Sequence, residues 1–424
     1  MSKLHSLSVI ALAAAFACGT ARAAEAAPAG LPDQKLDAAL RAVDALQHRI
    51  ELLEQRLAAT DPAGWGTRIE AVEHSVSQVE AAAVAATQVD TGLPIHGFAD
   101  VGGGVRNSAA AQGAPRGFKV GVFDLYMTPQ ISPQVKALVE LALEYDESGT
   151  LGVDAERMQL GYAFSDALTV WAGRFHTPYG YWNTAFHHGA QLQTSIARPR
   201  FLDFEDGGGT LPAHSVGAWA TGSTHTALGK VGYDFYVING DRIQDGVLDF
   251  QARGDSDHDI GAGFRAAVSP TGTGWTVGVH GLDQQVHGDN SEASAFGRVQ
   301  LRMTGGFATY DSDDWEAMAE YYHFSNHDLA GATGTHASNA WYAQAGYNLN
   351  DRFTPYVRIE DAALAAADPY FALQESGTSY RRAVAGVRYN LTPKAALKLE
   401  WLHTRESDAA GAANSLAAQY AIRF

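Results

Sequence analysis

The chain has 424 residues, a formal charge of −17 and one cysteine, Cys18. The negative charge disfavours nucleic acid as a partner, because phosphates would be repelled, and one cysteine excludes a disulfide framework or a thiolate metal site within the chain. Aromatic residues and glycine are abundant, with 44 Gly, 18 Phe, 17 Tyr and 8 Trp, yet beyond the N-terminus no stretch has the ~20 consecutive apolar residues of a transmembrane helix.

Residues 1–24 predict a secretory signal peptide. Lys3 gives a basic start, an apolar run extends from Leu7 to Ala17, and the small residues around Ala23 supply a cleavage site. Cys18 lies inside this segment. The mature protein is therefore expected outside the cytoplasm and without a cysteine.

Residues 28–89 predict a helical segment of a different composition, rich in Ala, Glu, Gln and Leu. An apolar residue recurs every seven positions, at Leu36, Val43, Ile50 and Leu57, with a second one three positions further on. This spacing is typical of a coiled coil. A Pro- and Gly-containing break at 61–66 separates it from a second apolar seam that begins at Ile69. The segment forms either a parallel coiled coil in an oligomer or a helical hairpin within one chain.

From residue 95 to residue 424 the pattern changes to alternation with a period of two, which predicts strands. In residues 135–146, Val, Leu and Tyr alternate with Lys, Glu and Asp, and residues 298–303 and 353–360 repeat the alternation. Long strands with one apolar face and one charged face are typical of a transmembrane barrel, whose outer face contacts lipid and whose inner face contacts water.

Short turns and long connections alternate along this region, as they do when short turns lie in the periplasm and long loops lie outside. The segments between them predict sixteen strands, an even number that allows a barrel to close. The last strand, Ser415 to Phe424, is expected to present an apolar face to lipid and to pair with the first. The predicted fold class is an all-β transmembrane barrel of about 16 antiparallel strands over 95–424, preceded by an α-helical coiled-coil segment.

With its signal peptide, its coiled-coil seam, its sixteen predicted strands and a final Tyr420-x-Ile422-x-Phe424, the chain resembles the Gram-negative trimeric outer-membrane porins. It is most similar to the phosphate-selective porin superfamily and its relatives with an N-terminal periplasmic coiled coil. The resemblance implies an outer-membrane location, a homotrimer, and recognition of the C-terminal strand by the barrel-insertion machinery. Phosphate selectivity in that family depends on loop lysines, and none of the seven lysines here falls in a long predicted loop.

Strand parity predicts which charged side chains line the pore. The predicted set is Arg265, Arg298, Arg302, Arg358, Arg382, Arg388, Glu140, Glu144, Glu316 and Glu320, with Glu360 and Glu400 on the same grounds. Two interpretations stay open. A basic wall could face an acidic wall across the pore, or Arg298 and Arg302 could pair with glutamates of the neighbouring strand.

The 37-residue connection from His176 to Pro212 has no strand pattern and is too aromatic to be disordered. We predict that it folds into the barrel as a constriction, although a subunit-interface loop and a lid are alternatives. The residues expected to pack are Tyr179, Tyr181 and Trp182, and those expected to face the solute are Arg198, Arg200, Asp203 and Glu205. His187 and His188 also lie in this loop, but adjacent side chains in an extended chain point apart and do not predict a metal site.

These features predict a porin for passive diffusion of small hydrophilic or charged solutes, including ion transport, with no enzymatic activity and no cofactor or metal. The expected partners are outer-membrane lipid and lipopolysaccharide, the insertion machinery, two further copies of the chain, and small solutes. One alternative is an outer-membrane barrel hydrolase that uses residues such as His176, His187, His214 and Ser215. The other is a plugged barrel that anchors the outer membrane to the cell wall.

Overall fold

The structure is a computed structural model. It describes residues 94–107, 117–129, 131–145, 149–186, 189–205, 207–249, 254, 259–289, 297–331, 333–350 and 352–424. The predicted signal peptide (1–24), the predicted coiled coil (28–89) and the two predicted loop histidines, His187 and His188, lie outside the described residues. Across the ranges that the structure describes, no helix has the length and apolar character needed to cross a membrane.

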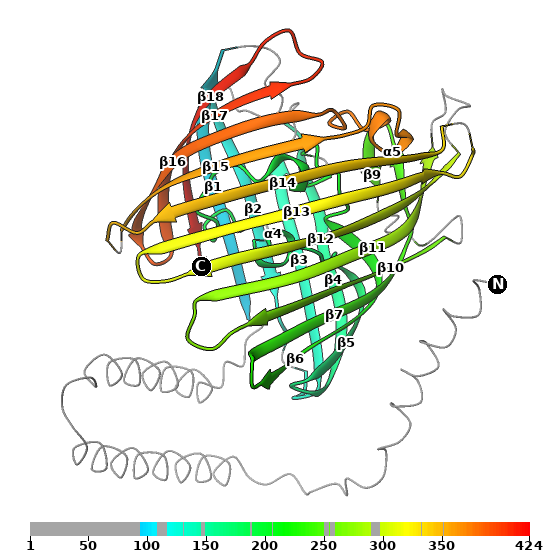
Figure 1. The fold of residues 1–424 in the computed structure, drawn as a ribbon. Coiled ribbons are helices and arrows are strands. Elements are labelled where there is room, and N and C mark those ends of the chain that lie inside the picture. The colour runs from blue at the N-terminus through cyan, green and yellow to red at the C-terminus, as the bar shows by residue number, and fades with distance from the viewer. Residues whose placement is uncertain are drawn as a thin grey trace, which may run out of the picture. The chain divides into compact units, whose positions relative to one another are not determined.

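Sixteen antiparallel strands form one closed barrel (Figure 1), which confirms the predicted fold class of the barrel region. Closure joins the first strand to the last, where Val101 lies opposite Tyr420 and Val105 opposite Leu416, so neither strand keeps a free edge. The barrel strands are β1 (Ile95–Arg106), β2 (Gly117–Met127), β3 (Val135–Tyr145), β4 (Leu151–Ser165), β5 (Leu168–His176), β6 (His214–Thr226), β7 (Gly229–Asn239), β10 (Ile260–Ser269), β11 (Trp275–Asp289), β12 (Arg298–Asp311), β13 (Trp315–Asp328), β14 (Thr335–Tyr347), β15 (Phe353–Ala363), β16 (Tyr380–Thr392), β17 (Ala395–Glu406) and β18 (Ala413–Arg423).

Alternation of side chains explains why these segments are strands. On β15, Val357 and Ile359 are exposed on the outer face, whereas Tyr356, Arg358 and Glu360, which alternate with them, are buried. The outer residues form an apolar surface and the inner ones place polar groups in the interior, as is typical of a transmembrane barrel. The same alternation around the ring positions the inward-facing charges that are described below.

The chain end completes the barrel. The backbone of Phe424 exchanges two hydrogen bonds with Gly97, of 3.0 and 3.2 Å. Its ring stacks on Phe123 with the ring centroids 5.8 Å apart. The final residue therefore belongs to the seam between the first and last strands.

Five short elements lie in long connections for which the sequence predicts loops. They are α4 (Trp182–Ala185), the 3-10 turn η1 (Arg200–Leu202), β8 (Asp241–Gln244), β9 (Val247–Asp249) and α5 (Pro369–Ala372). The β8–β9 hairpin extends the sheet, because β8 pairs in parallel with the end of β11 at Val286 and Asp241. It turns at Asp245 and Gly246, both of which have positive φ, 52° and 82°, as a two-residue hairpin turn requires.

The parity predicted for β12 is wrong by one residue. The positions expected to face lipid are instead buried in an apolar cluster inside the barrel: Val299, Leu301 and Met303. Arg302 points the other way, with its side chain 62% exposed and paired with Asp283, and Arg298 shares that outward face and pairs with Asp259. The physical reason is that packed side chains, not water, fill the interior beside this strand, so its apolar face is the inner one.

Glu316 and Glu320 consequently have different neighbours from those predicted. Across the β12–β13 pair, Glu316 lies opposite Asp311 and Glu320 lies opposite Phe307. The predicted pairing of these glutamates with Arg298 and Arg302 does not occur. The apolar cluster beside them extends from the 177–213 connection to the β8–β9 hairpin and α5, through buried residues such as Leu211, Ile243 and Phe371.

Candidate functional site

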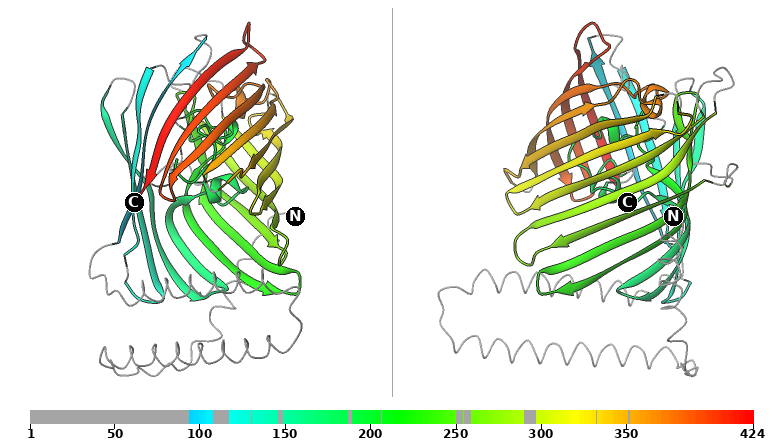
Figure 2. Two further views of the ribbon diagram at one scale, coloured as in Figure 1. Left: turned by 90° about the vertical axis from the view of Figure 1, so that its left-hand side faces the viewer. Right: turned by 45° about the vertical axis from the view of Figure 1, so that its right-hand side comes forward.

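Residues 177–213, which join β5 to β6, are called here the inner loop. Its helix α4 lies within the ring of strands in Figures 1 and 2, and its backbone bonds to side chains of β13, β15, β16 and β17. The loop therefore crosses the barrel from the wall that it leaves to the opposite wall.

Glu320 on β13 holds the start of the loop. Its two carboxylate oxygens accept hydrogen bonds from the backbone N–H groups of Tyr181 and Trp182, at 2.8 and 2.7 Å. The hydroxyls of Tyr322 and Tyr342 donate to the same carboxylate, at 2.7 and 2.5 Å. Glu320 is thus a fully bonded anchor and not a free charge facing a solute.

Gly180 makes this close approach possible. Its φ is +58°, and a Cβ there would lie 2.2 Å from the Oε2 atom of Glu320, so any other residue would strain the backbone and displace the carboxylate. Two residues further on, Trp182 is completely buried and packs edge-on against Tyr342, with the ring centroids 5.6 Å apart. The carboxylate and the indole together fix α4 to β13 and β14.

Two further glutamates repeat the arrangement on alternate strands. The carboxylate of Glu400 on β17 accepts from the backbone N–H groups of Ile196 and Ala197, both at 2.9 Å. Glu360 on β15 accepts from the backbone N–H of Arg200 at 2.8 Å. Glu320, Glu360 and Glu400 are called the carboxylate clamps. Hydrogen bonds from amides to a charged acceptor are stronger than neutral ones, so the clamps fix the loop at three points.

Arg358 holds the loop through its carbonyl groups. The side chain is 0% exposed, donates to Glu360 at 2.9 Å, and donates to the carbonyls of Ala197 and Arg198, both at 3.0 Å. Lys398 on β17 also donates to a loop carbonyl, that of Ser195, at 2.9 Å. Both cations are therefore used in positioning the loop.

The inner-loop residues predicted to face the solute are mostly buried instead. Arg198 donates to the carbonyl of Leu202 at 2.9 Å, and Arg200 pairs with Glu406 and lies 4.9 Å over the Tyr380 ring. The reason is that a loop inside a barrel packs on both of its faces. Asp203, with its side chain 35% exposed, is the most accessible of the four. Of the aromatic residues, Tyr179 is buried with Trp182, and Tyr181 is half-buried.

Glu205 closes the loop back onto β6. Its carboxylate accepts from the backbone N–H of His214 at 2.9 Å and contacts the His214 ring at 3.1 Å. Burial opposes ionisation, but the His214 ring and the hydrogen bonds outweigh it and hold the pKa of Glu205 below its usual range. The adjacent Ser215 hydroxyl bonds Thr177 at 2.6 Å. The histidine and serine considered for a hydrolase thus have separate partners.

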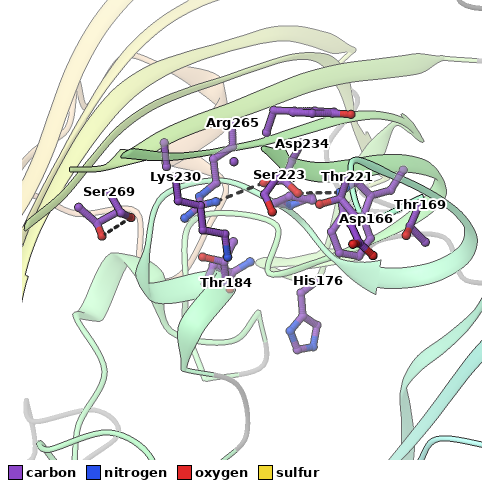
Figure 3. Close-up of a pocket in the computed structure, with 18 of the residues that line it drawn as sticks. Asp166, Thr169, His176, Thr184, Thr221, Ser223, Lys230, Asp234, Arg265 and Ser269 are labelled. Atoms are coloured by element: carbon purple, nitrogen blue, oxygen red, sulfur yellow. Dashed lines mark hydrogen bonds and ion pairs between the residues drawn. The ribbon is translucent and has the colours of Figure 1, made fainter. Parts of the chain in front are cut away.

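A cavity of about 550 Å³ lies beside the inner loop (Figure 3), toward the short turns between strands. It is bounded by the inner faces of β4 to β7, β10 and β11 and by Asn183 and Thr184 of the loop. One row of paired residues crosses its wall: Thr169 opposite Thr221, Thr221 opposite Asp234, and Asp234 opposite Arg265. The cavity is therefore polar and built mainly from strands.

Arginines at the cavity have carboxylate partners. Arg265 pairs with Asp234 at 3.2 Å and donates to the Gly180 carbonyl at 2.6 Å, and Arg157 pairs with Glu140 at 2.5 Å. Of the predicted pore-lining residues, Arg265 lines this cavity and Glu140 contacts it through Arg157. Sequence reasoning missed Arg157, Asp234 and the threonines, although their alternation on β4 to β7 was a usable pattern.

The remaining predicted pore-lining residues lie elsewhere. Arg388 donates to the inner-loop carbonyl of Gln193 at 2.9 Å, and Arg382 donates to Thr404 at 3.1 Å. Glu144 shares the face of β3 with Glu140, four residues along the strand, and lies opposite Gly152 of β4. Glu316 is partly buried on the inner face of β13. The structure therefore does not gather the predicted set into one ring.

Residues 260–424 match a family model described as "Outer membrane protein beta-barrel domain", and no curated protein matches the chain. The fold is similar to the anion-selective porin from Comamonas acidovorans, with 12% identity and a TM-score of 0.56 over 78% of this chain and 99% of that chain. The fold is also similar to OmpT of Vibrio cholerae in its trimer form, with 12% identity and a TM-score of 0.52 over 78% of this chain and 99% of that chain. For the outer membrane channel DcaP of Acinetobacter baumannii, the identity is 10% and the TM-score is 0.51 over 78% of this chain and 97% of that chain. These similarities show a porin-like barrel fold, and the family match supports an outer-membrane location.

Proposed function

We propose that this protein is an outer-membrane porin that passes small hydrophilic or charged solutes by passive diffusion, with the inner loop as its constriction. The observation that carries the proposal is the loop itself, which three carboxylate clamps fix inside a closed barrel beside a polar cavity. A channel that admits solutes by size and polarity needs a rigid obstruction within a wet lumen. The clamps supply the rigidity and the inner faces of β4 to β7 supply the polar surface.

The proposal includes export and assembly of the chain. Residues 1–24 would direct export, and residues 28–89, with their break at 61–66, would form a periplasmic coiled coil that holds a homotrimer. The last strand would be recognised by the barrel-insertion machinery, and the outer face would contact lipid and lipopolysaccharide. This combination of segments resembles that of the phosphate-selective porin superfamily, and phosphate itself is not proposed as the solute.

Single-channel recording in planar bilayers tests the function. Purified full-length protein should produce stepwise increases in current, and liposomes that contain it should swell in isotonic solutions of small solutes. Absence of both responses would favour the plugged anchor, to which the apolar cluster inside the barrel is suited. Ester or peptide hydrolysis that disappears in Ser215→Ala would favour the hydrolase.

Ion selectivity should respond to Arg265 and not to Arg302. Removing the Arg265 guanidinium leaves Asp234 in the cavity wall without its ion-pair partner, so Arg265→Ala should shift the reversal potential in a KCl gradient toward cation selectivity. Arg302→Ala is the matched control, because its side chain lies on the outer face, and it should leave the reversal potential unchanged. A shift in the control of the same size as that in Arg265→Ala would contradict the corrected strand parity.

A further inference from the structure

The cavity beside the inner loop carries a balanced set of charges. Arg157, Lys230 and Arg265 line it together with Asp166 and Asp234. Arg157 is paired with Glu140 behind the surface, so three positive groups are matched by three negative ones. Without a net charge, this wall neither concentrates nor repels a simple ion, and it exposes dipoles and ion pairs to whatever enters.

Serine and threonine hydroxyls line the cavity on β5, β6, β10 and β11. In Figure 3, Thr169, Thr221, Ser223 and Ser269 lie around Arg265 and Asp234. A serine or threonine hydroxyl both donates and accepts a hydrogen bond and rotates to suit its partner. The row from Thr169 through Thr221 and Asp234 to Arg265 crosses four neighbouring strands, about 14 Å at the usual strand spacing.

Trp219 adds a flat apolar surface to the same wall. Its indole N–H donates to Asp234 at 3.0 Å, and its ring packs on Phe175 and Trp171, with ring centroids 5.7 and 6.3 Å away. The ring is therefore held in one orientation at the cavity surface. A sugar or cyclic polyol has the matching chemistry, because its ring faces carry C–H groups and its rim carries hydroxyls.

The cavity also has the required space. Its volume of about 550 Å³ falls within the range of small-molecule sites, about 300–1,000 Å³. Small residues form part of the wall, since Gly232 and Ala267 lie opposite each other on β7 and β10. A Cβ added at Gly232 would meet only the Gly222 carbonyl oxygen, 3.9 Å away.

We propose that this cavity is a weak binding site for small uncharged polyhydroxylated solutes, pentoses and hexoses in size, on their way through the barrel. The balanced charges lower its preference for ions, the hydroxyl row and the Arg265–Asp234 pair bond solute hydroxyls, and Trp219 supports the ring face. The route of entry rests on the proposed porin function, but binding itself does not.

Binding is measured by saturation-transfer NMR on the full-length protein in detergent micelles, with D-xylose and D-glucose as probes and sodium acetate and tetramethylammonium chloride as charged comparators. Both sugars should give saturable transfer in the millimolar range, at least 10-fold stronger than either ion. Gly232→Leu, which fills the cavity without a backbone clash, should weaken sugar binding at least 10-fold. Thr221→Val, which keeps the volume and removes a hydroxyl, should weaken it several-fold.

Gly152→Leu is the matched control. Gly152 is also a strand glycine with room for a side chain, its nearest contact being the Glu144 carbonyl oxygen at 3.7 Å, and it does not line the cavity. This variant should bind both sugars as the parent protein does. Equal binding in the Gly232→Leu variant, or stronger transfer to acetate than to the sugars, would overturn the proposal. Sugar binding without channel current would support the binding site and refute the porin function. Channel current without sugar binding would support the porin function and refute the binding site.

Discussion

Replacing Glu320 with alanine should lower the free energy of unfolding of the barrel by about 3–5 kcal/mol and loosen the inner loop. The buried carboxylate accepts two backbone N–H groups of the loop and two tyrosine hydroxyls. Its removal leaves these donors without an acceptor. Each buried unsatisfied group costs about 1–3 kcal/mol of stability, and partial relaxation of the loop lowers the total cost. Urea titration of the folded fraction, followed by gel mobility and tryptophan fluorescence, measures the change.

Channel recordings give the second measurement on the same variant. A loop that has lost its attachment to β13 should move within the lumen, so the open-channel current of Glu320→Ala should fluctuate more than that of the parent. Asp283→Ala is the control, because this carboxylate lies on the outer face in an exposed pair with Arg302, and its stability should change by less than about 1 kcal/mol. Equal stability of the two variants would show that the clamp does not hold the loop.

Most of the barrel was predictable from sequence because its strands have to alternate. A strand with lipid on one side and polar groups on the other repeats every two residues, and the number of predicted strands, sixteen, equals the number of barrel strands. The short hairpin around Asp245 and Gly246 was missed, although an Asp-Gly pair between two short segments that contain apolar residues is a known hairpin pattern. It was overlooked because its strands, β8 and β9, have only four and three residues.

Which face of a strand points into the barrel was less predictable than the alternation itself. On β12, arginines at 298 and 302 suggested a wet interior, but the interior there is filled by an apolar cluster, and the charged residues lie outside. Periodicity identifies two faces and does not state which one is inside. A loop folded into the lumen reverses the usual assignment, and that depends on contacts between residues far apart in the sequence.

The role of the carboxylate clamps was also not predictable from the sequence, because it depends on contacts between distant residues. Glu320 and Trp182 are 138 residues apart, and Glu400 and Ile196 are 204 apart. Glutamates on the inner face suggested a charged pore lining, because in a strand pattern a lumen charge and an anchor for a loop look identical. Only the position of the loop backbone distinguishes them, and the loop carries no periodic pattern of its own.

Arg358→Met should be among the most destabilising single substitutions in the barrel and should lower the free energy of unfolding by about 3–5 kcal/mol. The side chain is 0% exposed, and it joins Glu360 to the carbonyls of Ala197 and Arg198. Removing one partner of a buried ion pair leaves an uncompensated charge. The Arg198 carbonyl loses the Arg358 donor as well, and the Ala197 carbonyl keeps the Ser195 hydroxyl as a donor. Arg358→Lys should recover little, because an ammonium group cannot reproduce the planar fork that reaches all three acceptors.

The double variant Arg358→Met with Glu360→Gln separates these two causes. It removes the unpaired charge and still lacks the donors to the loop, so it should be more stable than Arg358→Met alone while staying below the parent. Arg381→Ala is the control, since Arg381 is 85% exposed and pairs with Asp361 at the surface, and its change should stay within about 1 kcal/mol. Urea unfolding of all four proteins makes the comparison. If Arg358→Met matched the Arg381 control, Arg358 would not be an anchor of the loop, and the fixed constriction on which the channel proposal rests would lose its main cationic support.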